Sequence, residues 1–180
     1  MTTAISITQS NLFTALRTFL LSILPSGVEV VMAETNRVAE PEGSDFVVMT
    51  PLLRERQSTN VDTYADGYPS LPGVMNSIQS TKVTVQLDVH GPNSPDNAQI
   101  ISTLFRDEYA VDNVATSGYD VTPLYCGDPR QVPFLNAEQQ IEVRWSMDAV
   151  MQANPVVTVS QQFAAALDVV PESIDAFFHP

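Results

Sequence analysis

The sequence has very little cysteine: Cys126 is the one thiol in 180 residues. A single cysteine cannot form a disulfide within the chain, and it cannot supply the several thiolates of a structural zinc cluster. This cysteine usage fits a reducing compartment. An intramolecular disulfide and a thiolate zinc cluster are therefore excluded as sources of stability. We expect the fold to be stabilised by its apolar core.

Positive charge is also scarce. Eight Lys and Arg stand against 21 Asp and Glu, which gives a formal net charge of −13, and Lys82 is the one lysine. The arginines are scattered along the chain, at Arg17, Arg37, Arg54, Arg56, Arg106, Arg130 and Arg144. A grip on nucleic-acid phosphates needs clustered cations that release counterions, so this composition argues against nucleic-acid binding and against an anionic membrane surface.

Long hydrophobic runs are missing as well. The longest apolar region, from Leu12 to Leu24, contains Arg17 in its middle and is shorter than the roughly 20 residues that a membrane span needs. No Lys or Arg precedes Arg17, so we expect no cationic start of a secretory signal. The sequence predicts no transmembrane segment.

What the chain does have is apolar material for one sizeable core, since 44% of its residues are hydrophobic and a chain of this length buries about 70% of its unfolded surface. Ser10 is the expected N-cap of a first helix, in which apolar residues recur every three or four positions as far as Leu24. Pro25 and the residues after it end that helix. A short strand is expected at 28–32.

A second strand, at 45–53, is apolar on both alternating faces. Phe46, Val48 and Leu52 lie on one face, and Val47, Met49 and Leu53 lie on the other. We expect such a strand to be covered on both sides, on one by the core and on the other, if the chain forms an oligomer, by a neighbouring subunit. Pro51 lacks a ladder donor and predicts an edge position or a bulge near the strand's end.

Residues 81–90 alternate between apolar and polar side chains and predict a half-buried strand. Gly91 and Pro92 end it, and Ser94 is the expected N-cap of a second main helix. The buried stripe of that helix is expected to contain Ala98, Ile101, Leu104, Phe105 and Tyr109.

Further strands are expected at 119–125, 139–152 and 156–159, before a short C-terminal helix. The fold class that follows is α+β, a mostly antiparallel four- or five-stranded sheet with two main helices packed on one face. We expect a single domain over 1–180, with long loops at 34–44 and 56–79 and a C-terminal tail at 160–180.

No enzyme motif is present in the sequence. The seven glycines form neither a G-x-G-x-x-G nor a G-K-[ST] cradle, no H-E-x-x-H occurs, and His90 and His179 are far apart. The run from Gly67 to Gly73 has its serine at the wrong offset for a nucleophile elbow. Asp107 and Glu108 point about 100° apart on a helix and cannot share a proton. The sequence therefore predicts no catalytic, cofactor-binding or metal-binding residue, and no cofactor.

The best local constellation is Asp88 with His90, which share one strand face at a spacing of two and could orient each other. The simpler interpretation is a pair of solvated residues on a polar sheet face, because no nucleophile or third member accompanies them. Cys126 is interpreted as an inert small residue and Trp145 as a core residue. Arg144 and Asp148 are too far apart along one strand to pair, so each needs a cross-strand or cross-subunit partner.

More apolar side chains occur than a small monomer usually exposes. Besides the 45–53 strand, the predicted loop from Arg54 to Ser80 and the tail contribute to this excess, through Val61, Tyr64, Tyr68, Leu71, Val74, Met75, Ile78, Phe177 and Phe178. One interpretation is a homo-oligomer with the 45–53 strand near a subunit interface. The alternative is that these loops cover the domain's own core.

Four segments carry a resemblance to a known family: Asn36–Pro41 (NRVAEP), Met49–Pro51, Thr59–Tyr64 (TNVDTY) and Val83–Pro92 (VTVQLDVHGP). With them the chain resembles the neck or tail terminator proteins of tailed bacteriophages, and the likeness runs from the first helix to Asn154-Pro155. These strings are family-like segments and not catalytic motifs.

The resemblance implies a small subunit of a homohexameric ring in the virion neck, assembled in the host cytoplasm. Such a ring caps the tail tube protein, stops tube growth and joins the tube to the head-completion or connector protein, while DNA passes through without specific binding. The family carries no catalytic residues, and a net charge of −13 suits a channel that does not hold phosphates. The alternatives are a head-completion or stopper ring and, from another class, a small hydrolase or ligand-binding domain that uses Asp88 and His90.

Overall fold

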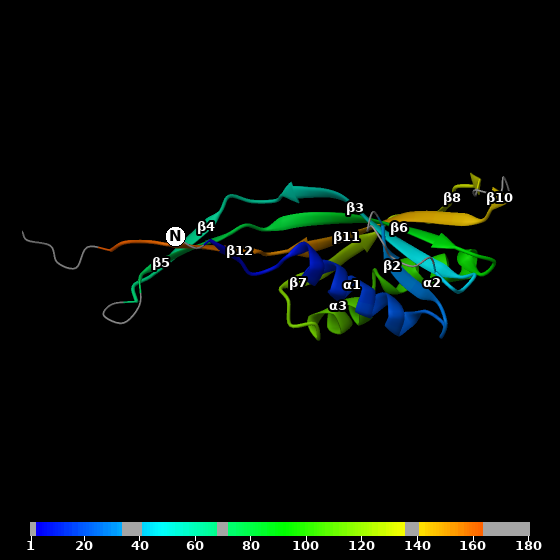
Figure 1. Cartoon of the computed structure of the whole chain (residues 1–180), viewed down its shortest axis with the longest axis horizontal. Helices are drawn as coiled ribbons and strands as arrows, with labels where there is room; N and C mark the ends of the chain where they lie inside the picture. The colour runs from blue at the N-terminus through cyan, green and yellow to red at the C-terminus, as the bar shows by residue number, and fades with distance from the viewer. Residues whose placement is uncertain (1–2, 34–40, 68–71, 136–140, 164–180) are drawn as a thin grey trace, which may run out of the picture.

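The fold is that of an α+β protein with an elongated shape (Figure 1). A computed structural model describes residues 3–33, 41–67, 72–135 and 141–163. Its main sheet, which we call the body sheet, has the strand order β2-β3-β6-β11-β7, and β8 pairs with β11 beside β7. The bounds are β2 Glu29–Met32, β3 Phe46–Arg56, β6 Thr81–His90, β7 Val121–Cys126, β8 Arg130–Gln131 and β11 Arg144–Ala153.

The helices α1 Gln9–Ile23, α2 Ser94–Leu104 and α3 Glu108–Ala115 pack on one face of the body sheet (Figure 1). Apolar side chains that alternate along β6 and β11 meet them and are almost fully buried, among them Val85, Leu87, Met147 and Met151. Phe19 of α1 and Phe105 beside α2 make an edge-to-face contact with ring centroids 5.7 Å apart. The core therefore lies between the helices and this face, as the alternation of residues 81–90 predicts.

The sheet differs from the predicted one in strand number and direction. Over the described residues it has six strands rather than four or five, it is mixed because β2 and β3 run parallel, and three helices cover it rather than two. The prediction of an α+β fold with mostly antiparallel pairing is confirmed, since β3, β6, β11 and β7 all pair antiparallel.

The predicted helix starts are each displaced. Thr8, not Ser10, caps α1, and its hydroxyl forms a capping box with Asn11. Asn93, not Ser94, is the N-cap of α2. The predicted helix through Tyr109 is two helices, because the Asp107 side chain accepts the Tyr109 N–H at 2.9 Å and starts α3 there. Tyr109 is consequently exposed rather than part of the buried stripe.

A second sheet forms an arm that projects from the end of the body, to the left in Figure 1. Its strand order is β1-β12-β5-β4, all antiparallel, with β1 Ala4–Ile5, β4 Val61–Ala65, β5 Val74–Ile78 and β12 Val156–Ser160. The predicted long loop at 56–79 is therefore wrong, since β4 and β5 form a hairpin within it. The predicted pairing of 156–159 is confirmed, and β12 lies between β1 and β5.

The long strand predicted at 139–152 is interrupted. β11 begins at Arg144, while Ile141–Glu142 forms β10, which pairs with β9, Phe134–Leu135. Residues 139–140, most of the predicted 34–44 loop, and the C-terminal helix and tail beyond residue 163 lie outside the described residues.

The 45–53 strand is longer than predicted and less covered. Val47 and Met49 are buried, Phe46 and Val48 are half-buried, and Leu52 and Leu53 are about half exposed. The register between β3 and β6 shifts between Pro51 and Leu53, so the predicted bulge at the proline is confirmed.

Candidate functional surfaces

The face of the body sheet opposite the helices, which we call the outer face, carries Asp88 and His90. Both lie on β6, as predicted, but both are buried, with exposed fractions of 7% and 8%. The prediction that they are solvated is wrong. Their cross-strand neighbours explain this, because His90 lies between Phe46 of β3 and Arg144 of β11 in the strand register, and long side chains on both sides shield it.

The carboxylate of Asp88 is committed to two neighbours. Its Oδ2 accepts a hydrogen bond from Nε2 of Gln86 at 2.8 Å, and its Oδ1 lies 3.9 Å from Nε of Arg144. The Arg144 contact confirms the predicted need for a cross-strand partner. A charge at this depth is tolerated only when paired, so Asp88 serves as the counterion of Arg144, which is a structural role.

Asp148 is the second acidic residue of β11 on this face. It lies opposite Gln86 in the register, and its Oδ1 is buried without a hydrogen-bond partner. No cross-strand ion pair is formed by Asp148 in the part of the chain that the structure describes, so its predicted partner is not found there.

His90 stacks on Phe46, with ring centroids 4.6 Å apart and planes only 6° from parallel. Burial lowers the pKa of His90, and this effect outweighs the opposing attraction of Asp88. The imidazole is therefore neutral at neutral pH and lies in an aromatic contact with Phe46.

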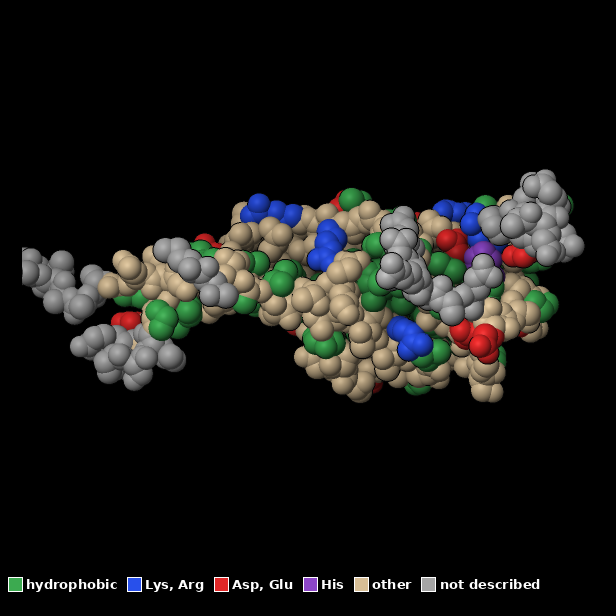
Figure 2. All heavy atoms as spheres, in the orientation of Figure 1, with side chains coloured by type: hydrophobic (Ala, Val, Ile, Leu, Met, Phe, Trp, Pro, Cys, Tyr) green, Lys and Arg blue, Asp and Glu red, His purple; other side chains and the backbone are tan. Residues whose placement is uncertain are grey.

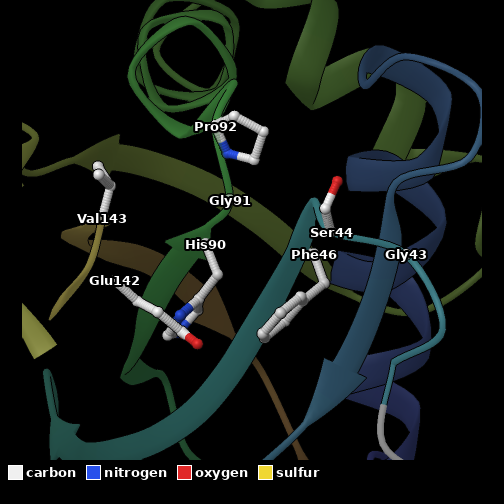
Figure 3. A pocket seen from close by; sticks show the side chains of 8 residues that line it. All are labelled: Gly43, Ser44, Phe46, His90, Gly91, Pro92, Glu142 and Val143. Atoms are coloured by element: carbon white, nitrogen blue, oxygen red, sulfur yellow. The ribbon is translucent and has the colours of Figure 1, made fainter. Parts of the chain in front are cut away.

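A hollow of 510 Å³ opens beside this stack (Figure 3). Its lining comes from the start of β3, the end of β6 and the β10 region: Gly43, Ser44, Phe46, His90, Gly91, Pro92, Glu142 and Val143. Figure 3 shows the His90 and Glu142 side chains close together at its wall. The hollow thus offers one neutral imidazole, one carboxylate and the hydroxyl of Ser44, and Figure 3 shows the Ser44 oxygen directed away from His90.

The wall of the hollow is held by a tight turn. Gly91 has φ +102°, and a Cβ there would lie 2.2 Å from the carbonyl oxygen of Ser44. Next to it, the Asp45 carboxylate accepts hydrogen bonds from the backbone and side-chain N–H groups of Asn93, at 2.9 and 3.0 Å. These two hydrogen bonds hold the start of β3 against the start of α2. No feature of the local sequence pattern indicated it.

Cys126 is buried, and burial raises the pKa of its thiol to about 12. At neutral pH the thiolate is negligible, and a thiol is a poor nucleophile. The interpretation of Cys126 as an inert small residue agrees with this environment. Trp145 is partly buried and packs against the core, as predicted.

The basic side chains are engaged within the chain. Nε of Arg17 donates to the carbonyl oxygen of Val30 at 2.9 Å, and Arg106 binds the carbonyl oxygen of Cys126 and the Asp128 carboxylate. Lys82 lies 2.5 Å from the Glu55 carboxylate, which raises the pKa of the lysine. Of these three side chains, Arg106 and Lys82 are paired with a carboxylate, whereas Arg17 contacts a carbonyl oxygen, which does not compensate its charge.

Neither a metal cluster nor a membrane helix is found among the described residues. No group of three or more His, Cys, Asp or Glu side chains there is placed to hold a metal ion. No helix in the described part has both the length and the apolar character for a membrane span.

The arm strands carry apolar side chains that are only partly covered. Every residue of its four strands is exposed or half-buried, and Val61 and Tyr64 of β4 have exposed fractions of 58% and 59%. Asp62 is the one charged residue in these strands, and uncharged and hydrophobic side chains dominate the arm face seen in Figure 2. Within the described ranges no second layer covers this sheet of the kind that stable sheets pack against.

The fold and its surfaces define an α+β protein with a projecting strand arm. The model of the phage neck terminator protein family matches residues 10–175, and the chain belongs to this family.

Among solved structures, the chain is similar to the sheath/tube terminator of an extracellular contractile injection system, PVC, in the extended state. The identity is 14% and the TM-score 0.44, over 96% of this chain and 66% of the other. This chain thus spans a little less than two thirds of that terminator. No curated protein matches the chain.

Proposed function

We propose that this protein acts as a ring of six identical copies in the virion neck, where it closes the tail tube, stops its growth and receives the head-completion or connector protein. The observation that carries the proposal is the family match over residues 10–175. The whole chain, 1–180, acts in this proposal as one unit that assembles in the host cytoplasm.

The low charge and the exposed apolar side chains of the arm support the proposal of a ring. A chain with a net charge of −13 repels further copies of itself, so copies can associate closely only where charge is sparse. The arm strands offer such a surface, with one carboxylate and many half-exposed apolar side chains. Partly exposed apolar surface of this kind marks interaction sites.

The pairing of basic side chains with carboxylates supports the proposal that DNA passes through the ring. A ring around a sliding polyanion works best if its lining does not trap phosphates, because each cation contact adds counterion-release affinity. Here Arg144, Arg106 and Lys82 are each paired with a carboxylate. The catalytic alternative has no comparable support, since Asp88 is committed to Arg144 and Gln86.

The proposal is tested by native mass spectrometry and negative-stain imaging of the protein, alone and with its tail tube protein. We expect six-copy rings, formed alone or on tube ends. In a phage that lacks the protein, we expect overlong tails without heads. Filled heads that leak DNA beside tails of normal length would instead identify a head-completion or stopper ring, and a protein that stays monomeric with the tube would contradict the ring.

A further inference from the structure

In the strand order the body sheet ends at β2 and β7 and the arm sheet ends at β1 and β4, and the first three of these end strands are protected against pairing with another chain. β1 is two residues long. At β2, the side chain of Arg17 occupies the carbonyl oxygen of Val30. β7 contains Pro123, which has no N–H to donate. Short length, a blocking side chain and proline are known ways to keep an edge strand from pairing.

The edge formed by β4 lacks these devices. β4 contains five residues without proline, it pairs with β5 in a regular register from Val61 to Ala65, and all five residues are exposed. Its other side ends the arm sheet in the strand order. An open edge with apolar side chains is a template for the addition of another strand. In β4 the charge of Asp62 is the one feature that disfavours such pairing.

We propose that the free edge of β4 pairs with an extended segment of a second copy of this chain. The occupant follows from the charge. A surface that binds a different kind of protein is expected to carry charge complementary to that partner. Two copies of this chain each carry a net charge of −13, so they can associate only through a nearly neutral surface. β4 and the other arm strands provide such a surface. The inference rests on the proposed ring and names the element that joins its copies.

A closed ring sets a further condition. In a cyclic ring each interface is head-to-tail, so β4 meets a different element of the neighbouring copy, whereas a two-fold pair would bring β4 against β4. The two arrangements differ in which residues of the two copies come together, and a single cysteine introduced into β4 can distinguish them.

The first experiment compares Thr63→Asp, in the middle of β4, with the matched control Thr103→Asp on the exposed face of α2. The new carboxylate would lose water where β4 meets the neighbouring copy, and it adds negative charge to two chains that already repel, so we expect Thr63→Asp to raise the concentration for half-assembly at least about tenfold. Thr103→Asp should assemble like the parent. Equal assembly of the two variants would overturn the inference.

Hydrogen exchange of the unaltered protein separates strand addition from other contacts. The β4 amides that face away from β5 should exchange fast in the monomer and slowly in the assembly. A ring that forms while these amides keep exchanging fast would overturn the inference and leave the proposed function standing. A protein that remains monomeric at millimolar concentration and with tail tubes would overturn both.

The third readout uses Thr63→Cys, whose introduced thiol is the one accessible thiol because Cys126 is buried. In the ring we expect no disulfide between two copies of this variant. A rapid disulfide that joins the introduced thiols of two copies would support pairing at the β4 edge but contradict the ring, because it requires a two-fold pair.

Discussion

The ring of Phe163 lies against Gly73, so closely that a Cβ at this glycine would be 2.2 Å from two ring carbons. The same ring makes an edge-to-face contact with Tyr64 of β4, with centroids 6.4 Å apart, and the adjoining N–H of Gln161 donates to the Gly73 carbonyl oxygen at 2.8 Å. The segment that follows β12 is thereby fastened across the arm hairpin.

Gly73→Ala should release this segment. The methyl group and the Phe163 ring cannot share the space, so we expect the ring to leave and the Gln161 amide to exchange faster, with little change in the global free energy of unfolding. Gly127→Ala is the matched control, since its Cβ would approach no closer than 3.4 Å. An unchanged exchange rate at Gln161 would contradict the close packing.

Asp88→Ala should lower the free energy of unfolding by about 1–3 kcal/mol, because it removes a buried acceptor of Gln86 and leaves Arg144 without its carboxylate. Urea denaturation measures this. The control is Asp62→Ala on exposed β4, which should stay within about 0.5 kcal/mol. Equal effects of the two substitutions would show that Asp88 is solvated after all.

His90 should make the protein less stable as the pH falls. Burial lowers the pKa of His90 below its unfolded value, so the unfolded chain binds a proton that the folded chain resists. The stabilisation is complete above the unfolded pKa, near about 6.5, and is lost as the pH falls from there through the folded pKa.

The measurement compares denaturant midpoints of the parent and His90→Phe between about pH 7.5 and 5, a range that brackets the unfolded pKa. The phenylalanine keeps the stack on Phe46 but cannot titrate, so its stability should fall less over this range. Carboxylates titrate in both proteins and cancel in the comparison. Parallel pH profiles would mean that His90 has the same pKa folded and unfolded.

The purified protein should not retain duplex DNA at low salt, where any phosphate affinity is greatest. Filter binding at about 50 and 200 mM salt tests this. The double variant Glu108→Lys, Asp112→Lys places two cations one turn apart on exposed α3, and its weak binding at the lower salt should show that the assay is sensitive. Tight binding by the parent that falls steeply with salt would reveal a basic surface.

The elements that were predicted well are those with strong local patterns. β6 runs over residues 81–90 as expected, because its apolar and polar side chains alternate without interruption. α1 was placed within two residues, but Thr8 and Ser10 are both good caps, and the choice depends on whether Asn11 can complete the capping box. The sequence does not predict the break before α3, because an aspartate such as Asp107 occurs both at the N-cap of a helix and on the exposed face of a continuous helix.

The arm and the outer face required tertiary information. Glycines and prolines between 66 and 73 made the whole region resemble a loop, although the short alternating runs on either side of it were a hairpin signal that was overlooked. Asp88 and His90 alternate as solvated residues do. They are buried only because Phe46 and Arg144 arrive from strands distant in sequence.

Three strands of the arm are neighbours in sequence of the central strands of the body, since β3 leads into β4, β5 into β6 and β11 into β12. The ladder hydrogen bonds are perpendicular to the strands. A pull along the arm therefore loads many of these bonds in shear at once instead of opening them one by one. A load on the arm would therefore pass along β6 and β11 to the far end of the body sheet, where His90 and Arg144 lie.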